Sequence, residues 1–188
     1  MIHFPDKKYN VIYADPPWKF GDRFWSAKKL ESGKNVQVSL NTHYETMSLQ
    51  DICNLPVPSI CFDDCVLFLW TTDAHIPDAI SVIESWDFVY KTVGFVWNKK
   101  TVNFKQVCYM GRWTMKGSEI CLLATKGHPH KLLKVRNVRQ LVEAKRRDHS
   151  QKPIEVANRI KLMFGDVPCI ELFARERIEG WDAWGNEI

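Results

Sequence analysis

The amino-acid sequence predicts an α/β fold in which helices cover a mainly parallel β-sheet. Short apolar segments with strand character alternate with amphipathic segments with helical character, which is typical of such folds. The segment 65–70 is apolar at every position, as a central strand covered on both faces must be. With 188 residues the chain is long enough for one domain, spanning 1–188, and short for two.

Five segments are expected to form strands because they are apolar and rich in β-branched and aromatic residues. In chain order these strands are expected at 10–14, 65–70, 88–97, 119–125 and 169–174.

Two segments are expected to form helices. The first begins with Thr72 or Asp73 as its cap and carries isoleucines at helical spacing between positions 76 and 83. The second spans 152–164 and has Pro153 near its first turn, where a missing N–H is tolerated.

Two further segments interrupt this alternation. Residues 21–48 are polar, aperiodic and punctuated by glycine, and a loop of this length in a compact domain is typically a functional lid or disordered. Residues 126–151 are basic and weakly patterned, and they are expected to carry little regular structure.

Positive charge is concentrated in one part of the chain. The net charge is +4, but residues 88–152 contain 15 Lys or Arg and 3 Asp or Glu. Such a run is either a solvated face or the contact surface for a polyanion. Because phosphate contacts supply most of the non-specific affinity for nucleic acid, the second interpretation predicts a nucleic-acid partner.

Other features argue against a membrane protein or a metal site. The N-terminus lacks the basic-then-apolar layout of a signal peptide and no apolar span of about 20 residues is present, so a cytoplasmic protein is expected. The six cysteines lie mostly within apolar runs and are expected to be reduced. Without a CxxC pair or a suitably spaced histidine, no metal site is predicted.

The segment Asp15-Pro16-Pro17-Trp18 directly follows the first expected strand. In an open α/β sheet, ligands bind at the carboxyl ends of the strands. Each proline fixes φ and removes an N–H donor, so this turn presents a carboxylate and backbone carbonyls, all of them acceptors. Trp18 is expected to offer a flat surface to a planar ring.

An amino group on a purine or pyrimidine suits a site made of acceptors. If Asp15 and the Pro16 carbonyl accept hydrogen bonds from its two N–H groups, the nitrogen lone pair is directed at an electrophile. This is catalysis by positioning. The alternative is a turn that merely ends a strand, with a tryptophan packed in the core.

The segment "ADPPW" resembles the catalytic signature of the amino-methyltransferases that modify exocyclic amines of nucleic-acid bases. Its Asp-Pro-Pro-Trp form is that of the family of the catalytic subunit of the eukaryotic messenger-RNA adenosine methyltransferase. The segments "CVLFLWTT", "GFVWNKK", "SQKPIEVANRI" and "IELFARERIEGWDAWGNEI" also resemble family segments in the same order, so the resemblance covers nearly the whole chain. It implies a Rossmann-like class I methyltransferase fold with circularly permuted motif order, in a small bacterial or phage-like member.

The resemblance also implies S-adenosylmethionine as the cofactor. Lys152 matches the residue that pairs with the methionine carboxylate of this cofactor, and Phe173 and Arg175 match positions flanking its ribose and adenine. The chain departs from the eukaryotic form at Arg177 and Ile178, which replace histidine and asparagine, and at Glu187, which replaces glutamine. The implied cofactor-binding residues are Asp15, Lys152, Phe173, Arg175, Arg177, Ile178, Asn186 and Glu187.

On the substrate side, the resemblance implies contacts of four residues with the acceptor base. Tyr44 matches the aromatic residue of a loop that closes over the target, and Trp97, Lys99 and Glu119 match positions around the base. The basic residues Lys145, Arg146 and Arg147 are expected to contact phosphates without reading sequence.

The reaction implied is methylation of the 6-amino group of adenine in DNA, with recognition of a short sequence or help from a second copy or partner subunit. The same reaction on RNA is the first alternative. A catalytically inactive scaffold subunit that binds nucleic acid is the second, and methylation of the cytosine amino group is the third. A cytoplasmic location, that of the host if the protein is phage-encoded, agrees with each of these.

Overall fold

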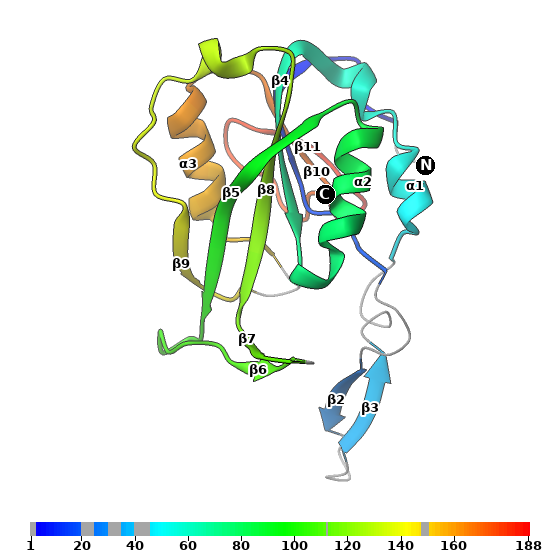
Figure 1. The fold of residues 1–188 in the computed structure, drawn as a ribbon, viewed down its shortest axis with the longest axis vertical. Helices are drawn as coiled ribbons and strands as arrows, with labels where there is room; N and C mark the ends of the chain where they lie inside the picture. Colours follow the sequence, from blue (N-terminus) through cyan, green and yellow to red (C-terminus); the bar gives the residue numbers. More distant parts are fainter. Residues whose placement is uncertain (1–2, 20–24, 30–34, 40–45, 112, 148–150) are drawn as a thin grey trace.

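The protein is built on one seven-stranded sheet with helices on both faces (Figure 1). The computed structural model describes residues 3–19, 25–29, 35–39, 46–111, 113–147 and 151–188. The strand order is β11-β10-β1-β4-β8-β5-β9. Strand β8 runs antiparallel to β4 and β5, whereas the other four pairings are parallel. The sheet is therefore mainly parallel, and the predicted Rossmann-like α/β fold is confirmed.

The strands of this sheet are β1 (Tyr9–Ala14), β4 (Cys61–Thr71), β5 (Val89–Lys100), β8 (Ser118–Lys126), β9 (Leu141–Lys145), β10 (Cys169–Leu172) and β11 (Asp182–Trp184). The helices are α1 (Leu49–Cys53), α2 (Ile76–Ser85) and α3 (Ile154–Phe164), with 3-10 turns η2 (Val57–Ile60), η3 (Asp73–His75) and η4 (Pro129–Leu132). Two small antiparallel pairs lie outside the main sheet: β2 (Trp25–Lys29) with β3 (Asn35–Ser39), and β6 (Tyr109–Met110) with β7 (Met115–Lys116).

Side chains of the central strands alternate between two apolar cores. In β1, Ile12 and Ala14 pack with helices α1 and α2, whereas Val11 and Tyr13 pack with helix α3 on the other face. In β4 the alternation continues through the fully apolar run, with Leu67 in the first core and Phe68 in the second. Because both faces of these strands are buried, their residues must be apolar at every position, as the sequence predicts.

Two predicted features of the chain need correction. Residues 126–151 are not merely irregular: β9 pairs in parallel with the end of β5, and its Val142 and Ala144 are buried. Helix α2 is not capped by Thr72 or Asp73, because the turn η3 comes first and His75 occupies the N-cap position. Within the described residues of the polar segment 21–48, β2 and β3 form an antiparallel pair.

The predicted elements otherwise match the structure, with small shifts at their ends. Strand β4 begins four residues earlier than predicted, and α3 begins directly after Pro153, which is its N-cap residue. Of the described helices, none has the length and apolar character needed to cross a membrane.

Candidate active site

The Asp-Pro-Pro-Trp turn lies at the carboxyl end of β1, between the ends of β10 and β4. The Pro16 carbonyl accepts the Trp18 backbone N–H at 2.8 Å, and the Pro17 carbonyl accepts that of Met47 at 3.0 Å. These bonds fix the turn against the start of helix α1. A carbonyl oxygen has two lone pairs, so the Pro16 oxygen keeps the capacity to accept a second hydrogen bond.

Asp15 belongs to a network of four charged side chains. The Lys152 Nζ atom lies 2.6 Å from Asp15 Oδ2 and 3.2 Å from Glu119 Oε2, and Lys99 forms an ion pair with the other Glu119 oxygen. The four side chains are between 10% and 18% exposed. Two carboxylates thus alternate with two ammonium groups at a largely dehydrated place, where their interactions are strong.

The residues of this network are far apart in the sequence and are brought together by the sheet. Asp15 follows β1, Lys99 lies near the end of β5, and Glu119 lies near the start of the antiparallel β8. Register pairs Trp97 with Glu119, which places Lys99 beside Glu119 at this edge. Lys152 approaches from the segment that leads into α3.

Burial and charge act in opposite directions on the pKa values of these groups. Burial raises the pKa of Asp15, and the nearby Lys152 only partly offsets this. Burial also opposes ionisation of Glu119, but Lys152 and Lys99 outweigh it and lower its pKa. Burial would lower the pKa of Lys152, yet the charges of Asp15 and Glu119 raise it. Lys152 is therefore a permanent cation shared by two carboxylates.

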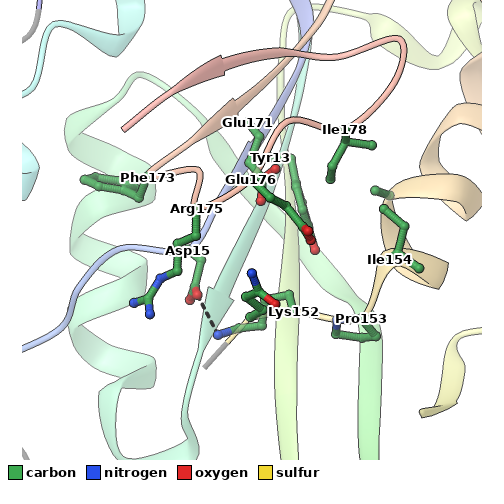
Figure 2. Close-up of a pocket in the computed structure, with 12 residues that line it drawn as sticks. Tyr13, Asp15, Lys152, Pro153, Ile154, Glu171, Phe173, Arg175, Glu176 and Ile178 are labelled. Carbon is green, nitrogen blue, oxygen red and sulfur yellow. Dashed lines mark hydrogen bonds and ion pairs between the residues drawn. The ribbon is translucent and has the colours of Figure 1, made fainter. Parts of the chain in front are cut away.

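A pocket opens beside Asp15 and Lys152, as Figure 2 shows. Phe173 and Arg175 lie on one side of it, and Pro153, Ile154 and Ile178 lie on the other. The lining residues come from β1, from residues 151–157 at the start of α3, and from β10 and the segment after it: Tyr13, Asp15, Gln151, Lys152, Pro153, Ile154, Ala157, Glu171, Phe173, Arg175, Glu176 and Ile178. The pocket therefore occupies the carboxyl ends of β1 and β10 and the N-terminus of α3.

The structure adds a carboxylate that the sequence reasoning missed. Glu171 lies on β10 and lines the pocket, and its buried Oε2 atom has no hydrogen-bond partner among the described residues. Burial, with added repulsion from Asp15 and Glu176, raises its pKa to about 8. The charged position within the apolar strand 169–174 was the signal that could have revealed it.

Backbone strain marks the exit of the chain from β10. Phe173 has a φ of +61°, a left-handed conformation that a bulky residue rarely adopts. Its ring packs edge-on against Trp184, and Gly185 lies so close to Ala174 that an added Cβ would come 2.4 Å from the Ala174 carbonyl oxygen. The turn after β10 is thus held against β11, which keeps Phe173 and Arg175 at the pocket.

Two tryptophans that the sequence places near the acceptor base are buried. Trp18 is 6% exposed, donates its indole N–H to the Trp70 carbonyl at 3.1 Å, and stacks on His75 at a centroid distance of 5.8 Å. Trp97 is 2% exposed and donates its indole N–H to the Ala144 carbonyl, while Lys99 Nζ lies 5.0 Å from its ring centroid. These contacts favour a supporting role for both rings, and their contact with a base stays a prediction.

Some of the remaining implied cofactor residues line the pocket and others do not. Ile178 lines the pocket together with Phe173 and Arg175. Arg177, Asn186 and Glu187 are exposed and do not line it, although Glu187 approaches Arg175 at 3.9 Å.

The predicted substrate residues are also divided. Lys145, Arg146 and Arg147 are exposed, and Arg147 is paired with Glu176 of the pocket wall, with one N–O distance of 2.9 Å. Tyr44 lies outside the described residues.

This arrangement can position a ligand rather than abstract a strongly bound proton. Asp15 is shared between the pocket and the ion network, so it can accept a hydrogen bond from a group that enters there. Lys152 stabilises its charge, and the pocket offers groups of both signs to a ligand. Among the described residues, no cluster of three or more His, Cys, Asp or Glu side chains could hold a metal ion.

Comparison with known proteins gives consistent matches. The family profile of MT-A70 matches residues 9–187. A type II methyltransferase, M.MunI, from a Mycoplasma species is 42% identical over 191 residues, which cover 98% of this chain and 79% of that protein.

Two more distant relatives are longer proteins. The N(6)-adenine-specific methyltransferase METTL4 of Mus musculus is 27% identical over 97% of this chain and 38% of its own length. The N6-methyladenosine RNA methyltransferase MTA1 of Pyricularia oryzae is 24% identical over 96% of this chain and 47% of its own length.

Proposed function

Because the chain belongs to the MT-A70 family and is a methyltransferase, we propose that it transfers a methyl group from S-adenosylmethionine to the 6-amino group of adenine in DNA. One observation carries this proposal above the others: Asp15 of the Asp-Pro-Pro-Trp turn lines the pocket and is also held by Lys152 at 2.6 Å. We therefore place the carboxylate of Asp15 between the site of the methyl donor and the site of the adenine that accepts the methyl group.

The residues of the pocket fit S-adenosylmethionine by charge. This molecule carries an ammonium group, a carboxylate and a positive sulfonium, and when bound it supplies an electrophilic methyl group. The pocket lining contains the carboxylates of Asp15 and Glu176, the carboxyl group of Glu171, and the cations of Lys152 and Arg175. Glu171 in particular has a buried oxygen without a hydrogen-bond partner among the described residues, which a donor group of the ligand would satisfy.

Particular residues are proposed to hold particular parts of the cofactor. Lys152 and the N-terminus of α3 suit its carboxylate, because a cation and a helix N-terminus both favour an anion. Phe173 and Ile178 supply apolar surface on opposite sides of the pocket, which suits the adenosyl part.

For the acceptor, Asp15 and the Pro16 carbonyl are proposed to accept hydrogen bonds from the two N–H groups of the adenine amino group. The neighbouring ammonium groups keep negative charge on the network, so Asp15 acts as a fixed acceptor. Adenine in a duplex has to leave the base stack before its amino group can reach a recessed carboxylate.

The names of the relatives support adenine as the target. METTL4 is named as N(6)-adenine-specific and MTA1 as acting on adenosine in RNA, whereas the more similar M.MunI is named a type II methyltransferase. The higher identity to M.MunI leads us to propose DNA, and the MTA1 similarity makes RNA the second candidate.

The test is incubation of the protein with isotopically labelled S-adenosylmethionine and oligonucleotides of matched sequence. Single-stranded DNA, duplex DNA and RNA are compared, and labelled nucleosides are identified by mass spectrometry. We expect label in N6-methyldeoxyadenosine from DNA. Label confined to RNA would support the second candidate, and label in cytosine or no transfer would contradict the proposal.

A control removes the reacting nitrogen alone. In an oligonucleotide in which purine replaces adenine, the ring remains but the 6-amino group is absent. Transfer to this oligonucleotide should stop while binding persists. Continued transfer would show that another atom accepts the methyl group.

A further inference from the structure

An exposed apolar surface lies next to the proposed active site and takes no part in the chemistry described above. It is formed by the turn after β5 and by the β6–β7 hairpin, and we refer to it as the hairpin surface. Its members are Val102, Phe104, Tyr109, Met110, Trp113 and Met115. Trp113 is 95% exposed, Met110 is 83% exposed and Val102 is 75% exposed. Several large apolar side chains exposed within one short stretch of chain favour an interaction site.

The hairpin surface is anchored rigidly to the strands that carry the ion network. Backbone hydrogen bonds join Lys99 N to the Gly117 carbonyl and Val107 N to the Lys99 carbonyl, both at 2.9 Å. Gly117 packs so closely that an added Cβ would lie 2.0 Å from the Val107 carbonyl oxygen. At the other end, Lys116 donates to Asp73 at 2.8 Å. The backbone at both ends of the hairpin is therefore held beside Lys99.

Tyr109 connects this surface electrostatically to the network. Its pKa is raised, first by partial burial and then by the negative charges of Glu119 and Asp73. The hairpin adjoins the strand ends that carry Lys99 and Glu119, because Lys99 N donates to the Gly117 carbonyl at the point where β7 leads into β8.

The charge around these side chains indicates which partner fits. Within residues 99–116, three lysines (Lys99, Lys100 and Lys116) are already paired with carboxylates of other segments. Among the described residues, the exposed cations of this region are Lys105 and, beside it, Lys145 and Arg146, because Lys145 is in register with Lys100 and Arg146 N donates to the Lys100 carbonyl. Lysine is depleted in the cores of protein–protein interfaces, and two copies meeting here would bring like charges together. Aromatic side chains interleaved with cations are instead the composition of surfaces that bind single-stranded nucleic acid, where rings stack on bases and cations follow the backbone.

We propose that the hairpin surface binds the nucleic-acid strand beside the target base. Trp113 would stack on an adjacent base or fill the gap that the target base leaves in the stack. This inference rests on the proposed function, because it assigns a contact to the substrate of the same site. Extruding a base costs stacking energy, and a protruding apolar side chain compensates by occupying the disrupted step.

The test measures affinity without requiring methyl transfer. Binding of fluorescein-labelled oligonucleotides (single-stranded DNA, duplex DNA and RNA) is followed by fluorescence anisotropy over a range of salt concentrations. We expect Trp113→Ala to raise Kd by roughly 5- to 100-fold, the effect of losing one stacked base. Trp113→Phe should retain most of the affinity because it keeps a ring.

Two controls separate stacking from other causes. Leu162→Ala removes another exposed apolar side chain, on α3, and should leave Kd unchanged. Lys105→Ala should flatten the dependence of Kd on salt, whereas Trp113→Ala should shift Kd without changing that slope, since stacking releases no counterions. Because Trp113 is almost fully exposed, its replacement should not alter the thermal midpoint.

Three outcomes would overturn the inference. One is a Trp113→Ala variant that binds every oligonucleotide like the parent. Another is loss of self-association in that variant, by analytical ultracentrifugation, with Kd for nucleic acid unchanged, which would make the surface an interface between copies. The third is a parent protein that binds none of the oligonucleotides.

The proposed function is tested separately by methyl transfer. A parent that methylates adenine while Trp113→Ala binds normally would sink the inference and leave the proposed function standing. A parent whose binding depends on Trp113 but which transfers no methyl group would support the inference and contradict the proposed function.

Discussion

The family resemblance implies that Asp15 and Arg177 contact the same ligand, yet the two residues lie in different surroundings. Asp15 ends a buried strand, lines the pocket and meets Lys152 at 2.6 Å. Arg177 lies in the irregular segment between β10 and β11, is exposed and does not line the pocket. The register of the sheet places residues at strand ends before any ligand binds. An irregular segment places its residues individually: Phe173, Arg175 and Ile178 of the same segment line the pocket, whereas Arg177 does not and is exposed.

Removing the shared cation is expected to have the largest effect. In Lys152→Ala, Asp15 and Glu119 lose the ammonium group between them, and two buried carboxylates are left facing each other. Breaking a buried ion pair from one side costs about 3–5 kcal/mol, so we expect a loss of about 3 kcal/mol in the free energy of unfolding. Urea denaturation measures this loss.

A neutral pair supplies the control for this variant. Lys152→Met with Asp15→Asn removes both charges while keeping similar shapes, and it should recover most of the stability that Lys152→Met alone loses. A double variant no more stable than the single one would show that the ion pair is not the cause.

Asp15→Ala is expected to act on catalysis more than on stability. Lys152 keeps its contact with Glu119, so the fold should persist. Without the acceptor, methyl transfer should fall by at least about 100-fold, the usual cost of removing one transition-state hydrogen bond. Single-turnover transfer to an adenine oligonucleotide measures the change.

Asp15→Asn is the matched variant, because its amide oxygen still accepts a hydrogen bond. It should retain more activity than Asp15→Ala. If Asp15→Ala kept most of the parent rate, the turn would be structural and the proposed role of Asp15 would be wrong.

The contrast between Asp15 and Arg177 also explains how far the sequence could predict the site. The strand periodicity places the turn at a carboxyl strand end, and the resemblance supplies Lys152, so their meeting in one pocket could be anticipated. Strand β9 was missed because its alternation is short and lies in a basic segment, where the buried Val142 and Ala144 are weak signals.

Tryptophans were harder to place than charged residues. Trp18 and Trp97 each combine a large apolar ring with an N–H donor, which suits a base-stacking role and a buried, hydrogen-bonded position equally well. The structure shows the buried position, in which the carbonyl groups of Trp70 and Ala144 accept hydrogen bonds from the two indole N–H groups. Both carbonyls come from segments distant in the sequence, so no local pattern reveals them. Among the tryptophans whose side chains the structure describes, Trp113 is the exposed exception.

Glu171 provides a test of the pocket by pH. Its pKa is raised to about 8 by burial and by the charges of Asp15 and Glu176, against an ordinary value of 4.5. The folded state therefore binds a proton that the unfolded state releases, so this residue makes stability fall as pH rises from about 4.5 to about 8. Glu171→Gln removes this contribution, and we expect it to be more stable than the parent by at least about 1 kcal/mol at about pH 9.

At about pH 4 both forms are neutral at position 171, so the two proteins should differ little in stability. Urea denaturation across this pH range measures the difference, and Glu179→Gln, at an exposed position, is the control. A constant difference between Glu171→Gln and the parent at every pH would contradict the raised pKa of Glu171.

The smallest effect is expected at Asn186, which follows β11. Its side chain is exposed, so Asn186→Ala should leave the free energy of unfolding within about 0.5 kcal/mol of the parent. If Asn186 contacts the bound cofactor, as the resemblance implies, loss of one hydrogen bond should raise the Kd for S-adenosylmethionine by roughly 2- to 10-fold, which calorimetry resolves. Glu179→Ala, at an exposed position between β10 and β11, should change neither quantity. An unchanged Kd in Asn186→Ala would remove this residue from the cofactor site, and a large loss of stability would show that Asn186 already supports the fold without the ligand.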